Sequence, residues 1–93
     1  MLSFPHSAEY AHFIAELKSL RERLGITQAQ LALRLGVDRT LVTKAEGGVR
    51  RLDVVELRAW LAALGVTLSV FVVDLEARLA RHEDPARRQR NSK

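Results

Sequence analysis

The sequence predicts a mainly α-helical protein of four to five helices, with one β-strand near the C-terminus. Three features lead to this prediction. Apolar residues recur at three- and four-residue spacing through residues 8–64, which is typical of helices that bury one face. Gly25, Gly36 and Gly65 each follow such a stretch, and a glycine at that place commonly ends a helix. Residues 67–73 break the pattern, because they are rich in β-branched side chains that alternate as in a strand.

The first and fourth helices are expected over residues 8–24 and 54–64. The first carries an apolar stripe that would face the core: Tyr10, Phe13, Ile14, Leu17, Leu20 and Leu24. The fourth begins after Asp53, and Glu56 three residues later completes the pattern of a capping box. Capping fully explains this pair of carboxylates, so the pair does not indicate an acid–base site.

Two short helices joined by a tight glycine turn are predicted between them. Thr27 and Gln30 form a second capping-box pattern at the start of the earlier helix, and Gly36 follows its end. Asp38 is placed to cap the later helix, which is expected over residues 39–46.

The helix at 39–46 has two chemically different faces. With successive residues about 100° apart, its apolar residues gather on one side. The opposite side carries the polar residues Arg39, Thr40, Thr43 and Lys44. Cationic and hydroxyl side chains suit the base edges exposed in a DNA major groove. The sequence therefore predicts a helix-turn-helix whose second helix contacts DNA bases through these four residues.

This arrangement resembles the Cro and phage-repressor type of helix-turn-helix, the Xre family, over roughly residues 14–66. The resemblance rests on LKSLRERLGITQAQLALRLGV, the KAEGG end of the second helix, RRLDVVEL and ALGV. It implies a phage-repressor-like domain in a single-domain transcriptional regulator, with the four polar residues lining the groove. It also implies that Gln28 contacts phosphate, and that Arg21 and Glu46 form a buried structural ion pair.

Positive charge is concentrated beside the second helix. The chain has a net charge of +4, and residues 39–51 hold four basic side chains against the single acid Glu46. Two of the four, Arg50 and Arg51, follow the helix, where a phosphate backbone would run, so we expect them to contact phosphates. The alternative is a solvated charged face without a partner.

Residues 67–73, TLSVFVV, are expected to form a strand. Because a lone strand leaves its backbone groups unpaired, we expect it to pair with the same strand of a second copy across a twofold axis. The dimer interface would then comprise Leu68, Val70, Phe71, Val72 and Val73. Such a strand resembles that of the antitoxins of certain toxin–antitoxin pairs. The alternative is a short helix packed on the domain.

The chain is accordingly divided into three parts. Residues 1–66 form the helix-turn-helix DNA-binding domain, and residues 67–80 form a dimerisation strand or helix. Residues 81–93 are expected to be a disordered basic tail, because a proline and a run of arginines follow the last apolar positions.

The inventory of side chains excludes several kinds of site. The chain contains no cysteine, and its three histidines lack zinc-like spacing, so we expect no metal and no cofactor. It also lacks a Ser–His–Asp set and a phosphate-binding glycine loop, so we expect no enzyme. There is no signal-peptide pattern, and the longest apolar run, residues 70–73, is too short to cross a bilayer. A cytoplasmic protein without a membrane partner is expected.

These features predict a homodimeric, sequence-specific repressor. Its partner would be a palindromic operator in double-stranded DNA, with half-sites about one helical turn apart. The alternative is an antitoxin that binds a toxin protein and represses their operon as a complex with it.

Overall fold

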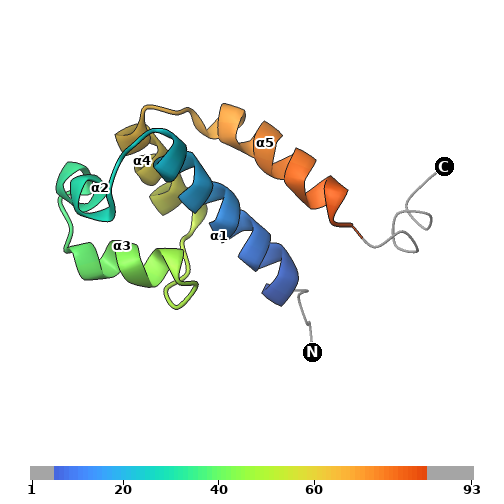
Figure 1. Cartoon of the computed structure of the whole chain (residues 1–93), viewed down its shortest axis with the longest axis horizontal. Helices are drawn as coiled ribbons and strands as arrows, with labels where there is room; N and C mark the ends of the chain where they lie inside the picture. Colours follow the sequence, from blue (N-terminus) through green and yellow to red (C-terminus); the bar gives the residue numbers. More distant parts are fainter. Residues whose placement is uncertain (1–5, 84–93) are drawn as a thin grey trace.

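The computed structural model describes residues 6–83, which contain five α-helices and no strand. In chain order they are α1 (His6–Arg23), α2 (Gln28–Leu35), α3 (Arg39–Glu46), α4 (Val54–Leu64) and α5 (Leu68–Arg81), as Figure 1 shows. The helices α3 and α4 have the predicted bounds, whereas α1 begins two residues earlier than expected. The basic tail expected at residues 81–93 lies, from residue 84 on, outside the described residues.

Local capping fixes the start of α2 and of α3. The Thr27 hydroxyl accepts a hydrogen bond from the Gln30 amide at 3.0 Å, and the Gln30 side chain accepts one from the Thr27 amide at 2.9 Å. Gly36 then turns the chain with a φ of 70°, in the left-handed region that favours glycine. Asp38 accepts from the Thr40 amide at 2.7 Å and starts α3. The angle between the two helices is therefore set largely by side chains in and beside the turn.

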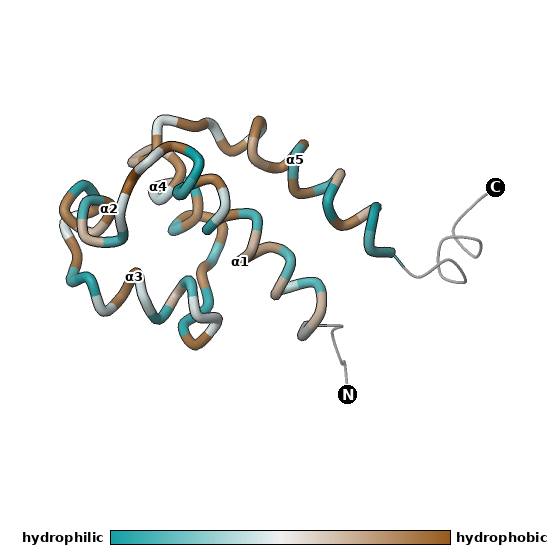
Figure 2. Tube along the Cα trace, viewed as in Figure 1, coloured by the Kyte–Doolittle hydropathy of each residue, from teal (hydrophilic) through white to brown (hydrophobic). Residues whose placement is uncertain are grey.

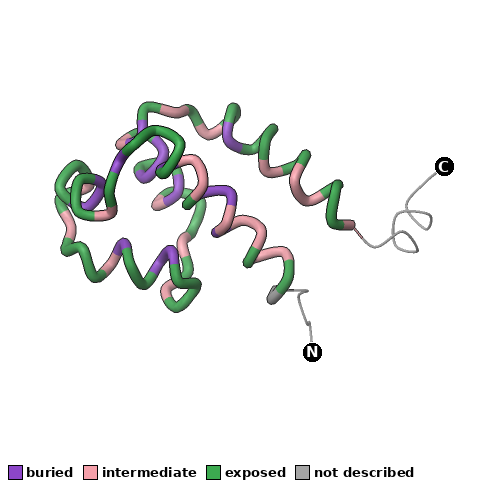
Figure 3. Tube along the Cα trace, viewed as in Figure 1, coloured by how far each residue is buried: buried purple, intermediate pink, exposed green. Residues whose placement is uncertain are grey.

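Every helix contributes to one hydrophobic core. Figure 3 shows buried positions on every helix. The largest fully buried side chains come from all five helices: Leu17, Leu31, Val42, Trp60, Leu61 and Phe71. Ile26, in the segment between α1 and α2, also packs into this core. None of the five described helices is by itself long and apolar enough to span a membrane.

The predicted β-strand is wrong, because residues 68–73 form the first half of α5. The Thr67 hydroxyl caps this helix by accepting from the Val70 amide at 3.3 Å. Phe71 is only 2% exposed and lies in the core of its own chain, and Leu68 and Leu75 pack against that core. Apolar side chains buried at helical spacing stabilise this segment as a helix, and the residues that follow it also favour a helix. Together these effects outweigh the modest cost of placing β-branched residues in a helix. Figure 2 shows the result, a helix that is hydrophobic at its start and hydrophilic toward its end.

The helix α5 lies along α1 and runs in the opposite direction (Figure 1). Arg78 donates to the Glu16 carboxylate at 2.9 Å, and the rings of His12 and His82 stack with centroids 4.2 Å apart. These contacts join the far end of α5 to α1, so α5 is held along most of its length.

We predict that Phe71→Ala lowers the free energy of unfolding by about 3–5 kcal/mol, because it leaves a cavity in the core. Urea unfolding followed by circular dichroism measures this loss. The control is Leu33→Ala on α2, since Leu33 is 83% exposed and its truncation should change stability by no more than about 0.5 kcal/mol. Equal effects of the two substitutions would contradict the helical placement of Phe71.

Candidate nucleic-acid interface

The exposed face of α3 carries the four residues predicted to contact bases. Arg39, Thr40, Thr43 and Lys44 are all exposed. On the opposite side of the helix, Val42 and Ala45 are fully buried. The structure thus brings the four predicted residues together on one open surface and fixes that surface to the core from behind.

The N-terminal cap of α3 determines which polar groups of Asp38 and Thr40 can still bind a ligand. Hydrogen bonds from the Thr40 side chain and from its amide lower the pKa of the Asp38 carboxyl below its ordinary value, so this carboxylate stays charged and caps α3. Both Thr40 donors are thus directed to the cap, which leaves the hydroxyl oxygen of Thr40 as an acceptor for a ligand.

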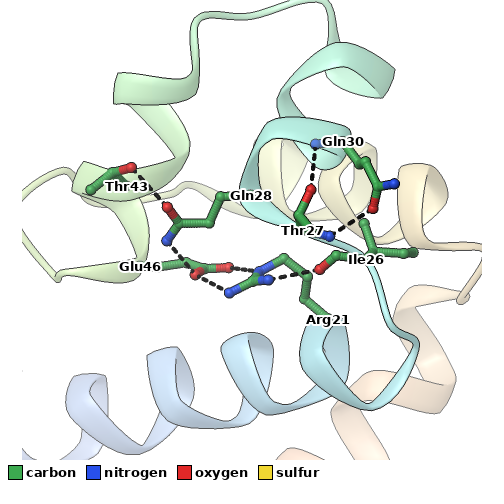
Figure 4. Close-up of polar contacts among 7 residues, drawn as sticks. All are labelled: Arg21, Ile26, Thr27, Gln28, Gln30, Thr43 and Glu46. Carbon is green, nitrogen blue, oxygen red and sulfur yellow. Dashed lines mark hydrogen bonds and ion pairs between the residues drawn. The ribbon is translucent and has the colours of Figure 1, made fainter.

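A buried ion pair lies beneath this surface. The Arg21 guanidinium donates to both carboxylate oxygens of Glu46, at 2.7 and 2.9 Å, and to the Ile26 carbonyl at 2.7 Å (Figure 4). The hydrogen bond to Glu46 raises the pKa of Arg21 despite the opposing effect of burial. This is the pair that the family resemblance implied, and it ties α1 to the end of α3.

Gln28 connects the same ion pair to the exposed face. Its side-chain nitrogen donates to Glu46 at 3.0 Å, and its oxygen accepts from the Thr43 hydroxyl at 2.9 Å (Figure 4). The amide nitrogen has a second hydrogen, which remains available to a phosphate. No local sequence pattern indicates the contact with Thr43, because the two residues lie 15 positions apart on different helices.

Arg50 and Arg51, both predicted to contact phosphate, have different surroundings. Arg50 forms a two-bonded ion pair with Glu56, at 2.6 and 3.2 Å, and its side chain is 39% exposed. This pair lowers the pKa of Glu56 to about 2. Arg51 lies with its guanidinium carbon 4.1 Å from the centroid of the Tyr10 ring. Tyr10, which the sequence placed only in an apolar stripe, is thus a neighbour of this surface.

The residues predicted to form the dimer interface divide into two groups. Val70, Val72 and Val73 are 56%, 41% and 68% exposed on the outer side of α5. Leu68 is half-buried, and Phe71 lies in the core rather than on an interface.

Five helices arranged in this way, with an exposed polar face on the third, define a helix-turn-helix protein. The sequence matches the helix-turn-helix family model over residues 17–71, more than half of the chain, and the chain belongs to this family. It is of the Xre type.

Individual relatives are controller and Xre-type proteins. The control protein C.MunI of Mycoplasma sp is 37% identical over 62 residues, which cover 66% of this chain and 84% of that protein. An XRE-family like protein from Pseudomonas syringae pv. tomato str. DC3000 has 38% identity and a TM-score of 0.72, covering 77% of this chain and 88% of that one. The restriction-modification controller protein C.Esp1396I, solved as a tetramer with its natural 35 base-pair operator, has 27% identity and a TM-score of 0.74. The match covers 80% of this chain and 97% of that one.

We predict that Arg21→Ala lowers the free energy of unfolding by about 3–5 kcal/mol, because it leaves the Glu46 carboxylate buried without its partner. The matched control is Arg23→Ala on the same helix, whose side chain is 55% exposed and whose removal should cost about 0.5 kcal/mol or less. Urea unfolding of both variants measures the difference. A loss for Arg21→Ala no larger than that of the control would show that the pair does not support the fold.

Proposed function

We propose that this protein is a DNA-binding transcription regulator that binds a palindromic operator as a homodimer and represses transcription. The observation that carries the proposal is the exposed face of α3, with Arg39, Thr40, Thr43 and Lys44 on a helix whose other side is buried. A short helix that offers only cationic and hydroxyl groups outward matches the width and chemistry of a major groove. The operator-bound form of C.Esp1396I supports the same mode of action.

The four side chains have distinct parts in base recognition. Arg39, in the first turn of α3, donates to the O6 and N7 of a guanine, and Lys44, one turn later, reaches a further base or a phosphate. Thr40 and Thr43 offer hydroxyls to base edges and methyl groups to thymine. The bond from Thr43 to Gln28 fixes the orientation of the Thr43 side chain before DNA is bound.

Phosphate contacts flank α3 on both sides. Gln28, at the first position of α2, offers its remaining amide hydrogen, and the amides of that helix end add a favourable dipole. Arg51 supplies a positive charge that no acidic partner neutralises among the described residues. Arg50 contributes less to phosphate binding, because Glu56 balances its charge.

The homodimer forms through the outer side of α5. Val70, Val72 and Val73 leave an apolar surface on this helix that the other described residues do not cover. Packing α5 against α5 of a second copy removes this surface from water, so helix pairing replaces the expected strand pairing. The tetrameric state of C.Esp1396I supports self-association.

The antitoxin alternative depended on the β-strand at residues 67–73, and α5 removes that basis. The fold therefore does not support a toxin partner.

The proposal is tested by incubating the purified protein with fragments of genomic DNA and sequencing those that are retained. Recovery of one recurrent inverted repeat, with half-site centres about one helical turn apart, is the expected result. Retention that depends on salt but not on sequence would overturn the assignment of a specific operator.

We predict that Arg39→Ala weakens binding to the recovered operator by about 1–3 kcal/mol and relaxes the preference at one base pair. Arg51→Ala serves as the comparison, since it should weaken all sequences alike and lower the slope of log K against log salt by about one unit. Fluorescence anisotropy with operator and random duplexes measures both. If Arg39→Ala weakens the two duplexes equally, Arg39 does not read a base.

We predict that Val73→Asp converts the dimer to a monomer, because it buries a charge in the α5–α5 contact. Sedimentation velocity at several protein concentrations measures the change. The matched control is Val55→Asp on α4, an equally exposed valine (73% against 68%) outside the proposed interface. A dimer that survives Val73→Asp, or dissociates equally with the control, would place the interface elsewhere.

A further inference from the structure

The segment between α3 and α4 presents one arginine whose charge is balanced and one whose charge is not. Arg50 is held by Glu56 in an ion pair with N–O distances of 2.6 and 3.2 Å. The exposed Arg51 has no hydrogen bond or ion pair from its guanidinium among the described residues. Its contact is the face of Tyr10, which reaches this segment from α1. The position of the unbalanced charge therefore depends on a residue far away in the sequence.

Tyr10 holds this segment by two different interactions. Its hydroxyl accepts a hydrogen bond from the Leu52 amide at 3.2 Å, across 42 positions of sequence. Its ring lies under Arg51, with the guanidinium carbon 4.1 Å from the ring centroid, well within the range of a cation–π contact. One interaction restrains the backbone next to Arg51, and the other restrains its side chain.

The Tyr10 ring is itself anchored to the core. It packs on Phe13 with centroids 5.3 Å apart, and Phe13 meets Phe71 edge-on with centroids 6.0 Å apart. Phe71 is 2% exposed. An aromatic series thus leads from the core outward to the arginine, so the ring under Arg51 is packed against the core.

A cation–π contact leaves the arginine able to bind an anion. A carboxylate would accept hydrogen bonds from the guanidinium, but the ring face does not. The five N–H groups of Arg51 therefore remain available to phosphate oxygens. A long side chain that is already restrained loses less conformational freedom when it binds than one that moves freely in water. Tyr10 therefore has the two properties needed to prepare Arg51 for DNA: it restrains the side chain and leaves its charge unbalanced.

We propose that Tyr10 is a positioning residue for DNA binding, which presents Arg51 to the phosphate backbone and thereby sets the sequence-independent part of the affinity. This inference rests on the proposed function and extends it to a residue of α1 that does not itself contact DNA.

The test is a double-mutant cycle in the full chain, with a mixed-sequence DNA duplex as the probe and binding measured over a range of salt concentrations. Tyr10→Leu should weaken binding by between about two- and fivefold and lower the salt slope toward that of Arg51→Ala. Tyr10→Phe keeps the ring that holds the Arg51 side chain and loses the bond to Leu52, so it should restore most of the slope of the unaltered protein. In the Arg51→Ala background, Tyr10→Leu should change the affinity by less than about twofold.

Packing effects are separated by Leu64→Val, which disturbs the core on α4 outside the series Tyr10–Phe13–Phe71, and by thermal unfolding of every variant. Leu64→Val should leave the salt slope unchanged. The proposal is overturned if Tyr10→Leu costs the same with and without Arg51, if Tyr10→Phe behaves as Tyr10→Leu, or if Tyr10→Leu tightens binding.

These results are distinguishable from a failure of the proposed function. If the unaltered protein does not bind the duplex, the DNA-binding proposal itself fails. If Arg51→Ala binds as the unaltered protein does, the phosphate contact assigned to Arg51 fails. If Arg51→Ala weakens binding and Tyr10→Leu does not, only the role of Tyr10 is refuted.

Discussion

The buried ion pair between Arg21 and Glu46 is the interaction on which the arrangement of the helices depends. It joins the last turn of α1 to the last residue of α3, and its third hydrogen bond, to the Ile26 carbonyl, fixes the segment that leads into α2. Glu46 also accepts from Gln28, which in turn accepts from Thr43 on the exposed face. Because either charge alone would be buried without compensation, the three helices are stable only in the arrangement that brings both together.

The acidic groups near this surface form contacts within the protein, whereas several of its cations face solvent. Asp38 caps α3, and the Glu56 side chain both completes the capping box of α4 and binds Arg50. The cations that remain exposed, Arg39 and Lys44 on α3 and Arg51 beyond it, form no ion pair among the described residues. The protein thus uses its local acidic groups internally, and the surface left for a ligand is cationic, as an electrostatic site for DNA requires.

The residues of the exposed α3 face could be predicted from sequence because helical periodicity alone sorts them from the buried ones. Other parts of the site could not. The bridge from Gln28 to Thr43 and the contact of Tyr10 with Arg51 join residues on different elements, and no local pattern encodes either. Arg50 illustrates the same limit, since its charge indicated a phosphate contact while its neighbour in space is Glu56.

Four of the helices follow from local sequence, because their capping residues, glycine stops and apolar spacing act within a few positions of one another. The conformation of residues 67–73 depends instead on packing against the rest of the fold. Alternation within seven residues favours a strand, whereas the spacing of Leu68, Phe71 and Leu75 favours a helix. The choice between them rests on whether Phe71 is buried against α1 and α4, and only the folded chain supplies that surface. The helix cost of Val70, Val72 and Val73 is a fraction of a kcal/mol each, or about 1–2 kcal/mol together. Burying Phe71 contributes about 1.5–3 kcal/mol, and the packing of Leu68 and Leu75 on the same side adds to it, so packing prevails.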